Sequence, residues 1–139
     1  MSLRDALAGV LARDSRYTIQ AYGFVFESLE YTKHLRKRAR VKAGGKRKRT
    51  PEISNHVSGR ELCQGARDLA LRQFGFLAMT VLSQWGVRST SDIGNIVYNL
   101  IASGDLEKTP HDSRADFDNV FDFEEALRRG YILALDDVA

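Results

Sequence analysis

The sequence predicts a mainly α-helical protein: one compact domain over residues 1–139 with about five helices and a small β-strand or hairpin near the C-terminus. Three observations lead to this prediction. Apolar residues recur at steps of three and four along most of the chain, which places them on one face of a helix. Capping and helix-stopping residues stand at the ends of these stretches. A length of 139 residues, 43% of them hydrophobic, suits one domain with a buried core.

The central element is a helix predicted over residues 59–85. Its apolar stripe consists of Cys63, Ala66, Ala70, Phe74, Leu77, Val81 and Trp85. Ser58 followed by Glu61 fits a capping box, in which each side chain satisfies a free backbone N–H of the other residue. Gly75 stands inside the stretch, where glycine disfavours a helix. It either divides the helix or lets another backbone approach closely.

Four shorter elements with helical periodicity flank the central helix, at residues 1–13, 16–38, 92–102 and 123–129. Tyr17, Phe24 and Tyr31 lie seven residues apart in the second of them, and we interpret this aromatic stripe as core packing. The helix at 92–102 begins after either Ser89, paired with Asp92, or Ser91 as its cap.

A different period is found between residues 116 and 123. Phe117, Phe121 and Phe123 alternate there with aspartates, which predicts a short strand. The apolar run from Tyr131 to Leu135 is compatible with a second short strand or with a packed tail.

Positive charge is concentrated in one segment. Ten of the 21 Lys and Arg residues lie between residues 33 and 49, with no acidic residue among them, although the net formal charge of the chain is only +3. Ala39 to Thr50 offers almost no apolar side chain for burial, and Gly44 and Gly45 interrupt it. Because such a segment repels itself, the sequence predicts a mobile basic loop at residues 39–50.

This segregation of charge favours a non-catalytic protein that binds RNA, a ribonucleoprotein or another polyanion without base specificity. Lys and Arg release counterions when they meet phosphates, which gives affinity without sequence recognition. The predicted contacts are Arg36, Lys37, Arg38, Arg40, Lys42, Lys46, Arg47, Lys48 and Arg49. The competing interpretation is a solvated loop with no partner. Membrane phospholipid is disfavoured because no amphipathic or lipidated anchor accompanies the charge.

A protein–protein interaction or scaffold module is the alternative function. The C-terminal third is acidic and carries aromatic residues, which predicts a surface at Asp118, Phe121 and Asp122 for a basic partner or for the protein's own basic loop. The competing structural interpretation is that these aspartates cap turns above a buried row of phenylalanines.

A winged-helix arrangement over residues 76–123 is a more specific version of the nucleic-acid hypothesis. Its recognition helix would present Asp92, Asn95, Tyr98 and Asn99, but no Lys or Arg, and its wing would be acidic. Duplex DNA would be repelled by such a surface, so this interpretation is disfavoured.

No catalytic residue, cofactor or metal site is predicted. Cys63 reads as a core thiol, and the three histidines are scattered. The calcium-loop pattern fails at Val120 and Phe121, and Gly44-Gly45-Lys46 lacks the remainder of a phosphate-binding loop. If two or more of the aspartates at 112, 116, 118 and 122 converged on one cavity, the question of an enzyme would be reopened.

The N-terminus lacks the continuous apolar run of a secretory leader, and no stretch approaches the roughly 18 apolar residues of a membrane span. We therefore expect a soluble, cytoplasmic protein.

Several motifs in combination resemble a known family. They are Ala21 to Val25, Val57 to Cys63, Leu69 to Gly75, Trp85 to Asp92 and Asp112 to Phe123. Together they resemble a family of small uncharacterised proteins found in planctomycete and verrucomicrobial bacteria. The likeness extends from Tyr17 to Tyr131, and it implies neither an assigned activity nor any functional residue.

Overall fold

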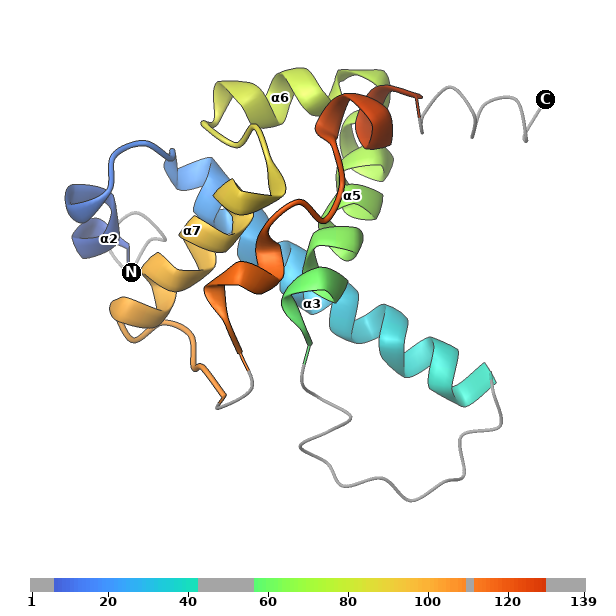
Figure 1. The fold of residues 1–139 in the computed structure, drawn as a ribbon, viewed down its shortest axis with the longest axis horizontal. Helices are drawn as coiled ribbons and strands as arrows, with labels where there is room; N and C mark the ends of the chain where they lie inside the picture. The colour runs from blue at the N-terminus through green and yellow to red at the C-terminus, as the bar shows by residue number, and fades with distance from the viewer. Residues whose placement is uncertain (1–6, 43–56, 110–111, 130–139) are drawn as a thin grey trace.

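The structure, a computed structural model, describes residues 7–42, 57–109 and 112–129 (Figure 1). The elements in chain order are α2 (Ala8–Arg13), α3 (Ile19–Lys42), α5 (Gly59–Phe74), η1 (Gly75–Leu77), α6 (Ala78–Gln84), α7 (Thr90–Ala102), η2 (Arg114–Phe117) and η3 (Glu124–Arg129). The first and second η elements are 3₁₀ turns, and η3 is a short π-helix. Within these ranges the protein is mainly helical, as predicted, and contains no strand.

The long helix α3 and the central helix α5 cross closely (Figure 1). The crossing is possible because Gly65 has no side chain: a Cβ atom there would lie 3.0 Å from Thr32 Cβ and would collide with its hydroxyl. Thr32 is buried and donates its own hydrogen bond to the carbonyl of Ser28, at 2.7 Å. Beyond the crossing, the C-terminal half of α3 extends past the helical body.

The predicted helix at 59–85 is divided at Gly75, which settles the alternative that the sequence left open. Gly75 ends α5 with φ 55° and ψ −131°, a conformation that a residue with a side chain rarely adopts. The chain then makes one 3₁₀ turn and continues as α6. The predicted capping box is present at the start of α5, where the Ser58 hydroxyl accepts from the Glu61 N–H and the Glu61 carboxylate accepts from the Ser58 N–H.

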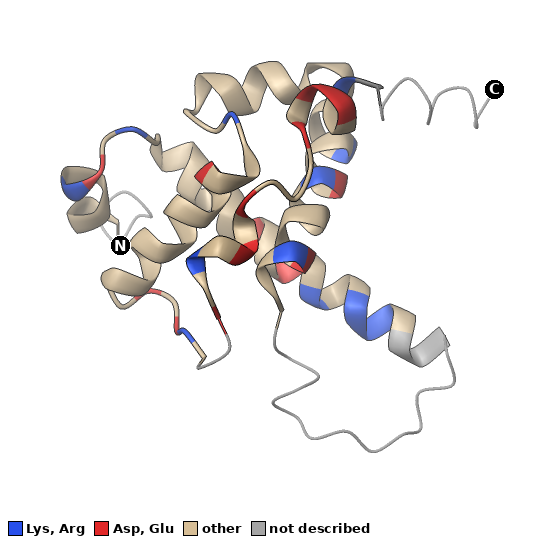
Figure 2. Cartoon of the chain, in the orientation of Figure 1, with Lys and Arg blue, Asp and Glu red and all other residues tan. Residues whose placement is uncertain are grey.

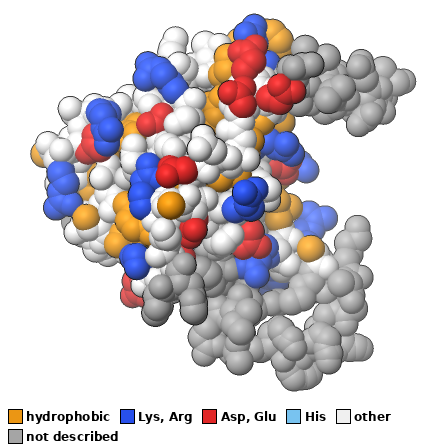
Figure 3. Space-filling model, viewed as in Figure 1, with side chains coloured by type: hydrophobic (Ala, Val, Ile, Leu, Met, Phe, Trp, Pro, Cys, Tyr) orange, Lys and Arg blue, Asp and Glu red, His pale blue; other side chains and the backbone are white. Residues whose placement is uncertain are grey.

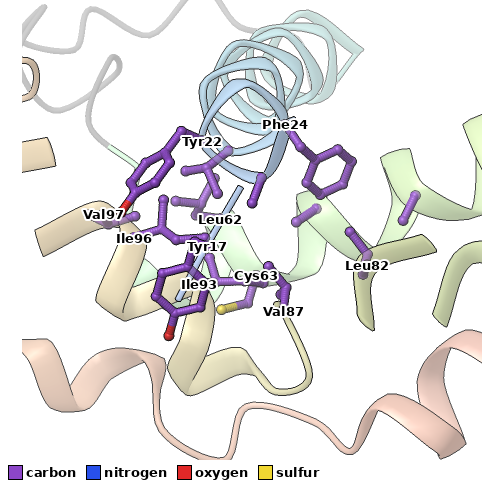
Figure 4. Close-up of a cluster of buried hydrophobic side chains, with 14 of the residues drawn as sticks. Tyr17, Tyr22, Phe24, Leu62, Cys63, Leu82, Val87, Ile93, Ile96 and Val97 are labelled. Atoms are coloured by element: carbon purple, nitrogen blue, oxygen red, sulfur yellow. The ribbon is translucent and has the colours of Figure 1, made fainter. Parts of the chain in front are cut away.

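The core lies where α3, α5 and α7 meet (Figure 4). Its buried side chains include Tyr22 of α3, Leu62 of α5 and Ile96 of α7. Cys63 is fully buried among them, as predicted for a core thiol. A second aromatic group joins α3 to the α5–α6 corner, where Phe24 packs against Phe74 and Trp85 with ring centroids 6.3 and 6.0 Å away.

The predicted strand at residues 116–123 is wrong. Ser113 and Asp116 form a capping box that starts η2, and Asn119, with φ 52°, turns the chain away from an extended path. Phe117 and Phe123 are nevertheless both buried, because the turn directs them into different parts of the core. The period-two alternation of phenylalanines and aspartates therefore arises from a bent segment that buries Phe117 and Phe123 in different places. It does not arise from a strand with one buried face. Residues 131–135 lie outside the described part of the chain.

The basic segment begins in a helix. α3 continues to Lys42, four residues beyond the predicted helix end, so residues 39–42 are helical and not part of a loop. The remaining residues of the predicted loop, 43–50, lie outside the described residues. Across the residues that the structure covers, no helix combines the length and apolar character needed to cross a membrane.

Candidate nucleic-acid interface

The C-terminal turns of α3 carry the first of the predicted nucleic-acid-binding residues. Figure 2 shows Lys and Arg on the part of α3 that extends past the body. Lys37 and Arg38 are exposed, and neither forms an ion pair within the described ranges. Arg36 is partly matched, since its Nε lies 3.5 Å from Glu61 Oε2 of α5. Within the described part of the chain, these two cations of α3 therefore have no acidic partner.

The remaining predicted contacts are only partly described. Arg40 and Lys42 belong to α3 by their backbone. Lys46, Arg47, Lys48 and Arg49 lie outside the described residues. The structure therefore places the start of the basic segment on a helix and brings Arg36 against α5.

A groove of about 300 Å³ runs between α3 and α5 beside this basic end. Thr32, Leu35, Arg36 and Ala39 line it from α3, and Glu61, Gln64, Gly65, Arg67 and Asp68 line it from α5. Arg60 lies one helical turn before Gln64 and is exposed. Sequence reasoning did not find Arg60 and Arg67, because they stand in a stretch of mixed charge whose orientation depends on the α3–α5 crossing.

The two carboxylates of the groove already have partners. One oxygen of Glu61 accepts from the Ser58 N–H at 3.0 Å, and the other faces Arg36. Asp68 accepts from the Tyr31 hydroxyl at 2.5 Å and lies 3.7 Å from Arg72. Burial first, and then the hydrogen bond to Asp68, raise the pKa of Tyr31, which keeps its hydroxyl a donor at neutral pH.

Arg60 and Arg67 make no ion pair within the residues described. Of the four exposed cations without an ion-pair partner among the described residues, Arg67 lines the groove, whereas Arg60 of α5 and Lys37 and Arg38 of α3 lie outside its lining. Elsewhere on the face shown in Figure 3, basic and acidic side chains of the described residues are interspersed.

The predicted partner-binding residues are held by contacts within the chain. Asp118 accepts from the Ser91 hydroxyl at 2.7 Å and from Arg114 at 3.1 Å, and these hydrogen bonds lower the pKa of its carboxyl. Asp122 caps the last turn by accepting from the Glu125 N–H at 3.0 Å. Phe121 is half-buried and stacks on Phe123, with ring centroids 5.9 Å apart. Asp122 thus caps a turn, as in the competing interpretation, whereas Asp118 joins η2 to the start of α7; partner binding at these residues stays a prediction.

The polar face of α7 is turned inward. The Tyr17 hydroxyl donates to Asp92 at 2.6 Å and accepts from Asn95 at 2.9 Å. Arg114 donates to the Asn95 amide oxygen at 2.6 Å, and Asn99 donates to Asp14 at 2.8 Å. The residues that a winged helix would use to contact bases therefore stabilise the fold instead.

A cavity of about 230 Å³ lies where α3, the start of α5, α7 and η2 meet, and the sequence did not predict it. Both Asp112 and Asp116 line it, so two of the four aspartates singled out in the sequence do share a cavity. Its serines act as helix caps: the Ser58 and Ser113 hydroxyls accept from the N–H groups of Glu61 and Ala115. Within the described residues, no three His, Cys, Asp or Glu side chains are grouped closely enough to hold a metal ion.

The chain matches no protein-family model, and neither a curated protein nor a solved structure matches it. The resemblance to the planctomycete and verrucomicrobial family therefore stays a prediction.

Proposed function

We propose that this protein binds RNA or another polyanion without base specificity, through the basic end of α3, the basic residues that follow it and the facing arginines of α5. The observation that carries the proposal is exposed positive charge at the end of α3 and on α5 that has no ion-pair partner among the described residues. Lys37 and Arg38 extend the basic run on α3, Arg67 of α5 lines the α3–α5 groove, and the groove carboxylates of Glu61 and Asp68 are already hydrogen-bonded or ion-paired.

The arrangement suits phosphates better than base edges. Lys37, Arg38, Arg60 and Arg67 are exposed side chains that reach a backbone without a fixed orientation. Sequence recognition requires side chains held at base edges in a defined geometry, or aromatic rings on which bases stack. No aromatic ring is found among the described residues that line the groove. The expected binding is thus electrostatic and strongly dependent on salt.

Fluorescence anisotropy with two unrelated single-stranded RNAs of equal length, each titrated at several salt concentrations, tests the proposal. Each phosphate contact on a single strand contributes roughly 0.7 to the slope of log affinity against log salt. The double variant Lys37→Gln, Arg38→Gln should therefore reduce the slope by roughly 1.4 on both RNAs. Alanine at Lys46, Arg47, Lys48 and Arg49 should reduce it further.

The matched control is Arg88→Gln, which removes one exposed arginine outside the groove. It should change the slope of log affinity against log salt much less than the Lys37/Arg38 variant or the alanine variant at residues 46–49. A flat salt response, or equal losses of affinity in the control and in these two variants, would contradict the proposal. A strong preference for one RNA would contradict the absence of base specificity. If Arg60→Gln, Arg67→Gln binds like the wild type while the α3 variants lose affinity, the α5 wall is not part of the surface.

A further inference from the structure

The C-terminal half of α3 has an inward side, against α5, and an outward side. The residues of this half that line the groove against α5, and so mark the inward side, are Leu35, Arg36 and Ala39. Successive residues of a helix are turned by about 100°, which places His34 near the middle of the outward side. Lys33 and Lys37 lie four residues apart along one edge of the outward side, and Arg38 lies along the other edge. The outward side therefore carries positive charge on both edges.

These cations are exposed, and no acidic residue follows Lys33 in α3. Lys37 and Arg38 have no ion-pair partner among the described residues. Lys33 lies 3.6 Å from Glu30 of the preceding turn, but both side chains are exposed, and such pairs are weak in water. By its position in the helix, Lys42 continues the edge of Arg38 by one turn. The outward side thus has a first row of cations, Lys33 and Lys37, and a second row, Arg38 and Lys42.

The shape of α3 suits a wide groove between two phosphate backbones. Figure 1 shows that its C-terminal half extends past the helical body, so its outward side is open to a large ligand. A helix with its side chains is about 10–12 Å across, and the major groove of B-form DNA is about 12 Å wide. The major groove of A-form RNA is deep and narrow, and an extended single strand has only one backbone. Of these three ligands, B-form DNA is the one that can place a backbone against each row.

We propose that the polyanion bound by this surface is B-form duplex DNA, with the C-terminal half of α3 in the major groove and each row of cations against one phosphate backbone. This inference rests on the proposed function and narrows its ligand. Between the rows, the helix has His34 and Val41 and none of the Arg, Asn or Gln residues that form paired hydrogen bonds with bases. The phosphate contacts therefore position the helix without reading the sequence.

Three nucleic acids of equal length test the inference: duplex DNA, duplex RNA of the same sequence, and one of the DNA strands alone. Fluorescence anisotropy with the full-length protein should show the tightest binding to duplex DNA. The preference should be roughly eightfold or more at about 0.1 M salt, which is the contribution of one additional phosphate contact. If duplex DNA binds no more tightly than the other two, the inference is wrong, whereas salt-dependent RNA binding would still support the proposed function. If none of the three binds, both are wrong.

Dimethyl sulfate reports which groove is occupied, because it methylates guanine N7 in the major groove and adenine N3 in the minor groove. Saturating protein should protect N7 of the duplex DNA and leave N3 as reactive as in free DNA. Protection of N3, or of neither position, would place α3 outside the major groove and overturn the inference.

Two double variants separate the rows. Lys33→Gln, Lys37→Gln removes the charge of the first row, and Arg38→Gln, Lys42→Gln removes that of the second. Each variant should reduce the slope of log affinity against log salt on duplex DNA by roughly 1.8, since each phosphate contact contributes roughly 0.9. If only one of the two rows affects this slope, α3 does not lie between two backbones and the inference fails.

The charge-matched control is Arg13→Gln, Arg88→Gln, which removes two exposed arginines outside α3. It should change the slope on duplex DNA much less than either row variant. Equal changes in the control and in the row variants would show that net charge, and not the placement of the two rows, determines binding, and would overturn the inference.

Discussion

The crossing of α3 and α5 can be tested by adding one methyl group. Gly65→Ala places a Cβ atom 3.0 Å from Thr32 Cβ and 3.3 Å from its methyl carbon, and closer still to its hydroxyl. Thr32 cannot simply rotate away, because it is buried and its hydroxyl donates to the Ser28 carbonyl. The new methyl group must therefore break that hydrogen bond, push the helices apart, or both.

Opposing contributions determine the magnitude. In an open helix, replacing glycine with alanine is favourable by about 1 kcal/mol. Overpacking a tight contact costs about 1–3 kcal/mol, and losing the hydrogen bond of Thr32 costs about a further 1 kcal/mol. We expect Gly65→Ala to lower the free energy of unfolding by roughly 1–3 kcal/mol, since the costs outweigh the gain in helix propensity.

The assay is urea unfolding followed by circular dichroism and by Trp85 fluorescence, with Gly9→Ala as the matched control. Gly9 lies in α2 with nothing within 4 Å of its added Cβ, so the control should be neutral or stabilising by up to about 1 kcal/mol. In a Thr32→Ala background the penalty of Gly65→Ala should shrink by about 1 kcal/mol or more, because the two sites are in contact. A Gly65→Ala protein as stable as the control would refute the close crossing.

Three further predictions concern a backbone conformation, an ionisable group and the buried thiol. Gly75→Ala should lower the unfolding free energy in urea by about 1–3 kcal/mol, because a side chain is strained at φ 55° and ψ −131°. Hydrogen bonds from Arg16 and Asn99 hold the pKa of the Asp14 carboxyl well below its usual range. The ionised carboxyl therefore contributes its full stabilisation above about pH 4 and loses it as the pH falls towards the pKa of the folded state. Asp14→Asn should lower the free energy of unfolding at pH 7, and urea titrations below about pH 4 should show a smaller difference from the wild type. Burial raises the pKa of the Cys63 thiol to about 12, so a thiol reagent should label it only in urea, and rapid labelling of the native protein would show that α5 is not packed as described.

Much of the helical structure could be predicted because local signals determine it. The Ser58–Glu61 capping box and the burial of Cys63 depend on residues near one another in sequence, and both are present in the structure. The cap of α7 was left open between two serines, and the structure selects Ser89, whose side chain accepts from the Asp92 N–H. The prediction of a strand at 116–123 was wrong because apolar and acidic residues also alternate when a bent segment buries its phenylalanines in separate parts of the core.

The candidate sites were less predictable, since they depend on polar residues that meet only after the helices pack. Sequence reasoning identified the basic run but not Arg60 and Arg67, and it named Asp112 and Asp116 without knowing that they line one cavity with Tyr98. The hydrogen bonds that Asp118 accepts from Ser91 and Arg114 also became visible only in the structure, and its role in partner binding stays a prediction.

By itself the sequence determined that this chain is mainly helical, which face of each helix is apolar, and that positive charge is gathered between residues 33 and 49. Only the tertiary structure decided which helices share a crossing and which carboxylates already have partners. The physical reason is that periodicity reports how one helix divides its residues between core and solvent. The partner of a polar side chain depends on the neighbouring helix, whose angle and depth are set here by single contacts such as Gly65 against Thr32.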